Sequence, residues 1–147
     1  RPTGAARILL VGVGAMAAEA YEAGRLLQQE GRAVTVVHPH WVIPAPAPLV
    51  AAAADVDVVV VVEDGLVDGG IGSQLRDAVE EYQAARSGTG GSPVFRRIGI
   101  PRRFVDTATR AQLMEDFGMR AVDIAQAARR AADGVAGART DQDLGAE

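Results

Sequence analysis

The stretch that decides the fold is residues 7–17, RILLVGVGAMA. A short apolar run that ends in glycines predicts a buried parallel strand leading into a tight turn. The residues that follow, 15–29, are rich in strong helix formers, and their apolar side chains recur at helical spacing. Gly31 then stands where a C-terminal helix cap belongs. The order strand, glycine turn, helix predicts the first unit of an alternating α/β fold.

The same cycle continues along the chain. Further strands are predicted at residues 33–37, 56–62 and 93–98, and helices at 49–54, 73–85, 109–116 and 121–132. The valine run at 56–62 is apolar on both faces, which predicts a central strand. Residues 87–92, SGTGGS, indicate a surface loop, and the segment Gly99-Ile100-Pro101 is expected to break the fourth strand. This alternation predicts a three-layer αβα sandwich with a mostly parallel sheet.

The length of 147 residues fits one domain. We expect residues 1–6 to be a linker, 7–132 the domain, and 133–147 a disordered tail because that end has little hydrophobicity. The chain opens without an initiator methionine, so we expect it to be a piece of something longer.

Composition excludes several classes of function. The chain has no cysteine and no lysine, so it has no disulfide, no thiolate nucleophile or metal site, and no Schiff-base lysine. Its 15 basic residues against 19 acidic ones give a net charge of −4, which argues against a nucleic-acid partner. No apolar run reaches the ~20 residues that a membrane helix needs, and no signal peptide opens the chain. We therefore expect a cytoplasmic protein with no membrane partner.

The glycine turn at residues 12–17 matches the pattern G-x-G-x-x-A between a strand and a helix. Such a turn presents backbone N–H groups to an anion, which makes Gly14 a candidate anion-binding residue. A dinucleotide site also needs an acidic residue at the end of the second strand, where this chain has Val37-His38-Pro39. Three interpretations stay open: a close-packed strand–helix turn, a nucleotide-binding regulatory module, and a phosphate or carboxylate site.

Glu63 and Asp64 lie at the carboxyl end of the third strand, where open α/β sheets hold their ligands. Adjacent residues on a strand point to opposite sides, so we do not predict a metal shared by the two carboxylates. Glu63 is either a structural residue or one that orients neighbours or pairs across an interface. Gly70 lies in a glycine cluster that predicts a second anion-friendly helix start.

The remaining candidates are histidines and arginines. His38 and His40 have a spacing that suits a metal, but no third ligand is evident nearby, and we predict no metal site. Arg102 and Arg103 could bind a phosphate or an acidic partner surface, or could simply be solvated. No serine lies in a nucleophile elbow, and no catalytic residue is predicted in this chain.

The order of these motifs resembles a known family. The matching stretches are RILLVGVGAMAAEAYEAGRLLQQEGRAVTVVHPHWVIP, VVVVVEDGLVDGGIGSQL and PVFRRIGIPRRFVDTATRAQLMEDFGMRAVDIA, which cover most of residues 7–128. They resemble the C-terminal domain of the transketolase-type thiamine-diphosphate enzymes, and within these the 1-deoxy-D-xylulose-5-phosphate synthases. The combination EDG…GGIGS followed by GIPRRF is the specific part of the match.

The resemblance implies a five-stranded sheet with four parallel strands and one antiparallel strand. It also implies a homodimer in which the upstream domains bind thiamine diphosphate and Mg²⁺, so the isolated chain is expected to bind neither and to be inactive. The implied reaction joins the two-carbon unit of pyruvate to glyceraldehyde 3-phosphate, and its product feeds isoprenoid, thiamine and pyridoxal synthesis. A stand-alone subunit of a split or divergent enzyme is the alternative within the family.

One departure from the family pattern bears on the substrate. The synthases usually have Asp-Pro-Arg-aromatic-Val-Lys-Pro after the second strand, and here residues 38–44 read HPHWVIP. In the family the arginine of that motif contacts the phosphate of the sugar acceptor. The resemblance therefore implies that His40 takes this place as the substrate-binding residue, with an imidazole where the family has a guanidinium fork.

Overall fold

The computed structural model describes residues 5–86 and 91–144. Its elements follow one another as β1 (Ile8–Val13), the 3₁₀ turn η1 (Gly14–Met16), α1 (Ala17–Gln29), β2 (Val34–Val37), α2 (Ala47–Ala54), β3 (Val58–Leu66), α3 (Ile71–Ala85), β4 (Val94–Ile100), α4 (Arg110–Asp116) and α5 (Ala121–Leu144). The predicted alternation of strands and helices is confirmed.

The described strands form one parallel sheet in the order β2-β1-β3-β4. The two inner strands, β1 and β3, are buried on both faces from residues 8–11 and 58–62. Valine, isoleucine and leucine fit such a strand because their side chains pack on both sides of the pleat. The prediction that the valine run is central is confirmed.

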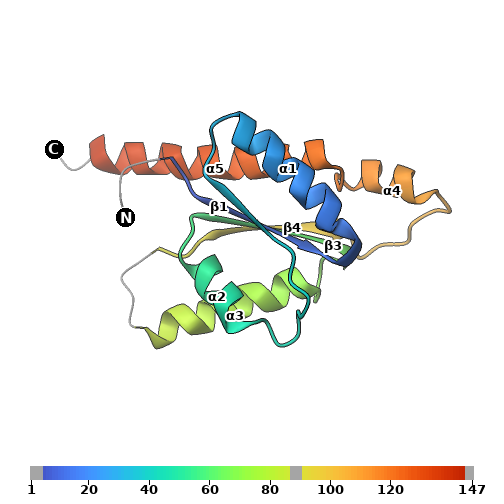
Figure 1. Cartoon of the computed structure of the whole chain (residues 1–147), viewed down its shortest axis with the longest axis horizontal. Helices are drawn as coiled ribbons and strands as arrows, with labels where there is room; N and C mark the ends of the chain where they lie inside the picture. Colours follow the sequence, from blue (N-terminus) through green and yellow to red (C-terminus); the bar gives the residue numbers. More distant parts are fainter. Residues whose placement is uncertain (1–4, 87–90, 145–147) are drawn as a thin grey trace.

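Helices cover both faces of the sheet. Figure 1 shows α1 and α5 on one side and α2 and α3 on the other, which gives the predicted three layers. Leu10, Val60 and Ile124 belong to the apolar cluster under α1 and α5, whereas Leu9, Val61 and Leu75 belong to the cluster under α2 and α3. The alternation of side chains along β1 and β3 therefore feeds two separate cores.

The strand count corrects the expectation taken from the resemblance. The described residues contain four strands, all parallel, and no antiparallel fifth strand among them. Only four of the described segments have the apolar runs of strands, which is why nothing in this part of the chain supplies the fifth. β4 also continues through Gly99 and Ile100, where a break was predicted, because Val67 N–H donates to Ile100 C=O at 3.0 Å and extends the pairing with β3.

The end of the chain also differs from the expectation. The sequence predicts a disordered tail from residue 133, whereas α5 continues to Leu144. Ala131 and Ala132 are buried and Val135 packs against the core, so the helix has an apolar face to bury beyond the predicted end. In the expected linker, Ala6 is likewise buried in the core. Residues 1–4, 87–90 and 145–147 lie outside the described residues, and with them most of the predicted loop at 87–92.

Ion pairs fasten the far half of α5 to the end of α1. Arg129 donates to both carboxylate oxygens of Glu30 at 3.0 and 2.6 Å, and Arg32 pairs with Asp133 at 2.8 Å. The hydrogen bonds from Arg129 lower the pKa of the Glu30 carboxyl below its ordinary value. These contacts give Arg129 and Asp133 of α5 partners next to the end of α1.

Candidate functional site

The candidate site is the edge of the sheet where the parallel strands end. Each strand delivers one segment to this edge: the turn 12–16 after β1, residues 38–46 after β2, residues 63–70 at the end of β3, and residues 101–109 after β4. In open α/β sheets this is the edge that binds ligands. Most of the residues singled out in the sequence lie on these segments.

The glycine turn after β1 is tightly packed on one side and open on the other. A Cβ at Gly12 would lie 2.7 Å from Ala20 Cβ and 2.9 Å from Ala17 Cα, so the strand and α1 approach each other here as only glycine allows. Gly14 is exposed and has a φ of +57°, and a Cβ added there would have no atom within 4 Å. The turn therefore serves close packing at Gly12, while Gly14 faces outward.

The two histidines lie beside each other next to this turn. His38 Nδ1 lies 2.9 Å from Gly12 O, and because a carbonyl only accepts, Nδ1 carries the proton of this hydrogen bond. The His40 ring lies with its centre 5.6 Å from that of His38, at an interplanar angle of 47°. Both residues are exposed. The two rings, which are two residues apart in the sequence, therefore also lie side by side in the structure.

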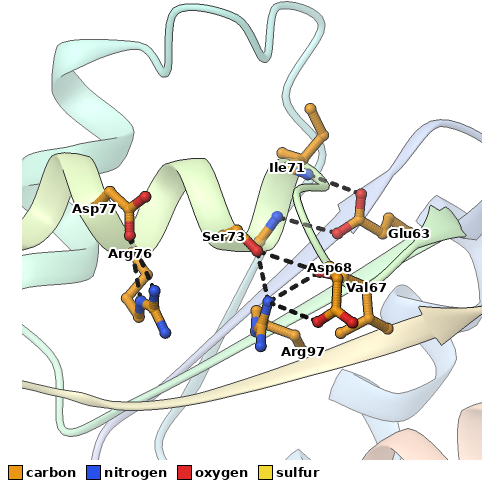
Figure 2. A network of polar contacts seen from close by, with 9 residues as sticks. Glu63, Val67, Asp68, Ile71, Ser73, Arg76, Asp77 and Arg97 are labelled. Carbon is orange, nitrogen blue, oxygen red and sulfur yellow. Dashed lines mark hydrogen bonds and ion pairs between the residues drawn. The ribbon is translucent and has the colours of Figure 1, made fainter. Parts of the chain in front are cut away.

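Glu63 caps the start of α3. Its Oε2 accepts a hydrogen bond from Ile71 N–H at 2.8 Å and its Oε1 accepts one from Gly72 N–H at 3.1 Å, as Figure 2 shows. The residue is only 6% exposed. A carboxylate at this position satisfies two helix donors and faces the positive end of the helix. The predicted anion-friendly helix start at Gly70 is therefore occupied by a carboxylate of the chain itself.

Two glycines make room around Glu63. A Cβ at Gly70 would overlap the Glu63 carboxylate and Leu66 O, and a Cβ at Gly99 would lie 3.0 Å from Glu63 O and 2.8 Å from Gly65 O. The glycine cluster that the sequence suggested for anion binding thus lets β3, β4 and α3 close around a buried carboxylate.

Arg97 of β4 fixes the loop between β3 and α3. Its Nη1 donates to Val67 O at 2.9 Å and to Ser73 Oγ at 2.5 Å, and lies 4.0 Å from Asp68 Oδ1 (Figure 2). These partners hold it partly buried. Arg97 therefore acts within the domain, beside the Glu63 cap.

Asp64 points to a different element from Glu63, as expected for neighbours on a strand. Its Oδ2 accepts from Arg110 Nε at 3.3 Å and Nη2 at 3.2 Å. Arg110 belongs to α4, whose capping box is formed by Thr109 and Gln112. Sequence reasoning missed Arg110 because 46 residues separate it from Asp64, and no local pattern marks such a pair.

Arg102 and Arg103 lie on the exposed segment after β4. Arg103 is stacked over the Phe117 ring, with its guanidinium carbon 5.6 Å from the ring centre. An open hollow of about 480 Å³ lies beside it, lined by Arg103, Phe104, Val105, Asp106, Ala108, Leu113, Asp116 and Phe117. The structure places these arginines on the β4 side of the sheet, whereas the histidines follow β2 at the opposite side.

Large apolar side chains are exposed on the same strand-end segments. Trp41 is 66% exposed, Phe104 is fully exposed, and Ile43 and Leu66 are about half exposed. Trp41 and Ile43 follow β2, Phe104 follows β4, and Leu66 is the last residue of β3. Exposed apolar side chains of this size mark a surface for contact with another protein segment when they gather on one edge.

The described residues provide no metal centre and no membrane span. Within residues 5–86 and 91–144 there is no group of three or more His, Asp or Glu side chains placed to hold a metal ion. None of the helices in that part of the chain has the length and apolarity needed to cross a bilayer.

Comparison with known proteins identifies the family of this domain. Residues 3–124 match the family model of the transketolase C-terminal domain. The chain is 38% identical over 125 residues to the 1-deoxy-D-xylulose-5-phosphate synthase of Rhodococcus jostii, which covers 85% of this chain and 18% of the relative. It is 41% identical over 122 residues to the 1-deoxy-D-xylulose-5-phosphate synthase 2 of Kitasatospora griseola, with 83% and 18% covered.

A solved structure gives the same result. A protein described as a split gene transketolase, inactive β4 tetramer, superposes with a TM-score of 0.70 and 27% identity over 88% of this chain and 39% of that chain. The chain spans about a fifth of the length of the curated relatives that it matches. The chain belongs to the transketolase C-terminal domain family.

Proposed function

We propose that this chain is the C-terminal domain of an enzyme of the 1-deoxy-D-xylulose-5-phosphate synthase type. The enzyme decarboxylates pyruvate and transfers the two-carbon unit to glyceraldehyde 3-phosphate, giving 1-deoxyxylulose 5-phosphate and CO₂. The observation that carries the proposal is the 38% identity to such a synthase over 125 residues, which is 85% of this chain. The domain contributes surface and substrate contacts, and bond making takes place elsewhere in the enzyme.

The exposed apolar side chains support a role in assembly. Trp41, Ile43, Leu66 and Phe104 are exposed on the strand-end segments, where Asp64 at the end of β3 also pairs with Arg110. A surface of this kind is stabilised when it is covered by another protein segment. In this proposal the upstream domains of the same polypeptide and the second subunit of a homodimer cover it.

Thiamine diphosphate and Mg²⁺ are bound outside this chain in the proposed enzyme. The described residues do not fit the two groups: the α3 start, which could otherwise hold a diphosphate, is filled by the Glu63 carboxylate, and no carboxylate cluster is placed to hold Mg²⁺. We therefore derive no chemical step through the cofactor from the residues of this chain.

His40 is the residue that we assign to the acceptor. It is exposed at the strand-end edge, next to the glycine turn of β1 through its neighbour His38. An imidazole donates one hydrogen bond where an arginine donates two with a fixed charge. The experiment is steady-state kinetics of the longer protein with pyruvate and glyceraldehyde 3-phosphate. His40→Arg is expected to lower KM for the phosphorylated acceptor several-fold with kcat little changed.

Two results would contradict this proposal. The absence of turnover with these two substrates would reject the synthase assignment. An unchanged KM in His40→Arg would remove His40 from the acceptor site. The matched control is Arg25→Ala, an exposed change on α1 away from the strand-end segments, which is expected to leave KM for the acceptor within about twofold.

A second candidate within the family is a separate subunit of a split enzyme. The solved protein that superposes on this chain carries the description split gene transketolase, which favours considering this arrangement. Purification of the native protein distinguishes the two forms. One polypeptide several times longer than 147 residues supports the domain, and a short chain that restores activity to a separate partner chain supports the subunit.

A further inference from the structure

The chain between β4 and α5 stands apart from the rest of the domain. We call residues 101–116, which are the segment after β4 together with α4, the arm, and Figure 1 shows it projecting past the ends of the strands. Every side chain from residue 102 to residue 112 is exposed. Residues 104–108 have no hydrogen bond or ion pair to any other residue that the structure describes. The outer part of the arm therefore presents its surface to whatever lies beyond this domain.

The base of the arm is fixed to the domain. Met114 of α4 is buried in the core, and Arg110 at the start of α4 pairs with Asp64 at 3.2 Å. The capping box of Thr109 and Gln112 closes the first turn of the helix. A partner that docks against α4 thus meets a surface that is already in place, which lowers the ordering cost of binding.

The hollow of about 480 Å³ beside α4 combines apolar walls with unpaired carboxylates. Its apolar lining includes Val105, Leu113 and Phe117. Asp106 and Asp116 also line it, and neither carboxylate forms an ion pair with another described residue. The hollow therefore suits an apolar side chain that has a cation next to it in the chain.

The first half of the same arm carries such a segment. Phe104 is fully exposed at the rim of the hollow, and Arg102, two residues before it, has no ion-pair partner among the described residues. Arg103 between them is stacked over Phe117, with its guanidinium carbon 5.6 Å from the ring centre. The arm is therefore basic and aromatic in its first half, and acidic with an apolar hollow in its second half. Within one chain Arg102 does not pair with Asp116, so each half is left for another molecule.

We propose that the arm docks on the arm of a second copy of this chain. A two-fold axis places the first half of each arm on the second half of the other, so that the same contact is made twice. Phe104 enters the partner's hollow, and Arg102 pairs with the carboxylates that line it. Burial of an exposed phenylalanine and pairing of opposite charges both favour this arrangement over one in which like halves meet. The inference rests on the homodimer of the proposed function and names the segment that joins its C-terminal domains.

The size of the arm sets the expected strength of the contact. A standard interface buries about 800 Å² on each partner with about 20–30 residues. The arm has about sixteen residues, so two arms bury roughly 1,000 Å² in total, which is the low end for a specific contact. We therefore expect the 147-residue chain to dimerise with a dissociation constant of about 1–100 µM.

Sedimentation velocity of the 147-residue chain, over concentrations that bracket this constant, tests the docking. The parent is expected to shift from monomer to dimer as its concentration rises. Phe104→Asp is expected to raise the dissociation constant at least about tenfold, because an aromatic anchor carries much of the energy of a small interface. The matched control is Tyr21→Asp, an exposed aromatic residue beside β2 at the far side of the sheet, which is expected to leave the constant within about twofold.

A charge exchange tests the pairing of unlike halves. Arg102→Glu makes the first half of the arm acidic, and Asp106→Arg/Asp116→Arg makes the second half basic, all at exposed positions. Each variant alone opposes like charges in both contacts of its dimer and is expected to dimerise at least about tenfold more weakly than the parent. In an equimolar mixture unlike charges meet in both contacts, so a heterodimer of near parental strength is expected. Circular dichroism checks that each variant is folded.

Three results would overturn the inference: a chain that stays monomeric at every concentration, a dimer that Phe104→Asp leaves unchanged, or charge variants whose mixture is no stronger than either variant alone. The first result would leave the upstream domains of the same polypeptide as the cover of the arm. None of these measurements depends on turnover, so each of them leaves the synthase assignment intact. If the longer protein turns over no glyceraldehyde 3-phosphate, the proposed function fails, while sedimentation still decides on the arm.

Discussion

The buried carboxylate of Glu63 provides the sharpest prediction on stability. Glu63→Gln keeps the shape of the side chain, and its one remaining carbonyl oxygen can accept from only one of the two α3 donors, Ile71 N–H and Gly72 N–H. The amide NH₂ then faces the other donor. The change therefore removes the negative charge from the helix start and leaves one buried N–H without an acceptor.

The expected loss follows from these two effects. Hydrogen bonds to charged groups contribute about 1.5–3 kcal/mol each, and an unsatisfied buried donor costs about 1–3 kcal/mol. The free energy of unfolding is therefore expected to fall by about 2–3 kcal/mol in Glu63→Gln. For a domain of this size that corresponds to a decrease in Tm of roughly 5–10 °C.

The assay is urea unfolding at neutral pH, followed by circular dichroism, with Asp64→Asn as the matched control. Asp64 is adjacent in sequence but pairs with Arg110 at the surface, so its neutralisation is expected to change the free energy of unfolding by about 1 kcal/mol or less. A Glu63→Gln variant that unfolds within about 0.5 kcal/mol of the parent would refute the assignment of Glu63 as the cap of α3.

Two further predictions concern packing and pH. Gly12→Ala places a methyl group 2.7 Å from Ala20 Cβ and is expected to lower the free energy of unfolding by about 1–3 kcal/mol. The control Gly134→Ala, in open space on α5, is expected to raise it by about 0.5–1 kcal/mol. If the two variants had the same midpoint of unfolding in urea, the close approach of β1 and α1 at Gly12 would be contradicted. Because Arg129 lowers the pKa of Glu30, the pair stabilises the fold at neutral pH and the contribution is lost as the pH falls below about 4.5. Glu30→Gln is therefore expected to unfold earlier than the parent at pH 7, with the difference closing towards pH 3; a constant difference would contradict the pair.

The two inner strands were predictable from sequence because all of the side chains in their apolar runs, on both faces of the sheet, are buried among apolar groups. The runs at residues 8–11 and 58–62 are apolar throughout, and such runs fit only a strand buried on both faces. The opposite directions of Glu63 and Asp64 followed from the two-residue period of a strand. The resemblance to the transketolase C-terminal domain rested on the order of these motifs, and the family match confirmed it.

The partners of the polar residues were not predictable in the same way. The sequence showed a carboxylate and a glycine-rich helix start eight residues apart, but only the folded geometry shows that the first fills the second. The pairing of Asp64 with Arg110 likewise depends on where α4 lies. The continuation of α5 past residue 132 buries Ala131 and Ala132 against the core, and Arg32, which follows α1, pairs with Asp133 there. The low hydrophobicity of the segment after residue 132 does not reveal these contacts.

The central claim is that this domain supports a cofactor held by other parts of a larger enzyme. Calorimetric titration of thiamine diphosphate with Mg²⁺, into the 147-residue chain and in parallel into the longer protein, tests it most directly. The account predicts saturable binding by the longer protein and no measurable heat of binding with the chain alone. Stoichiometric binding by the chain alone would contradict it.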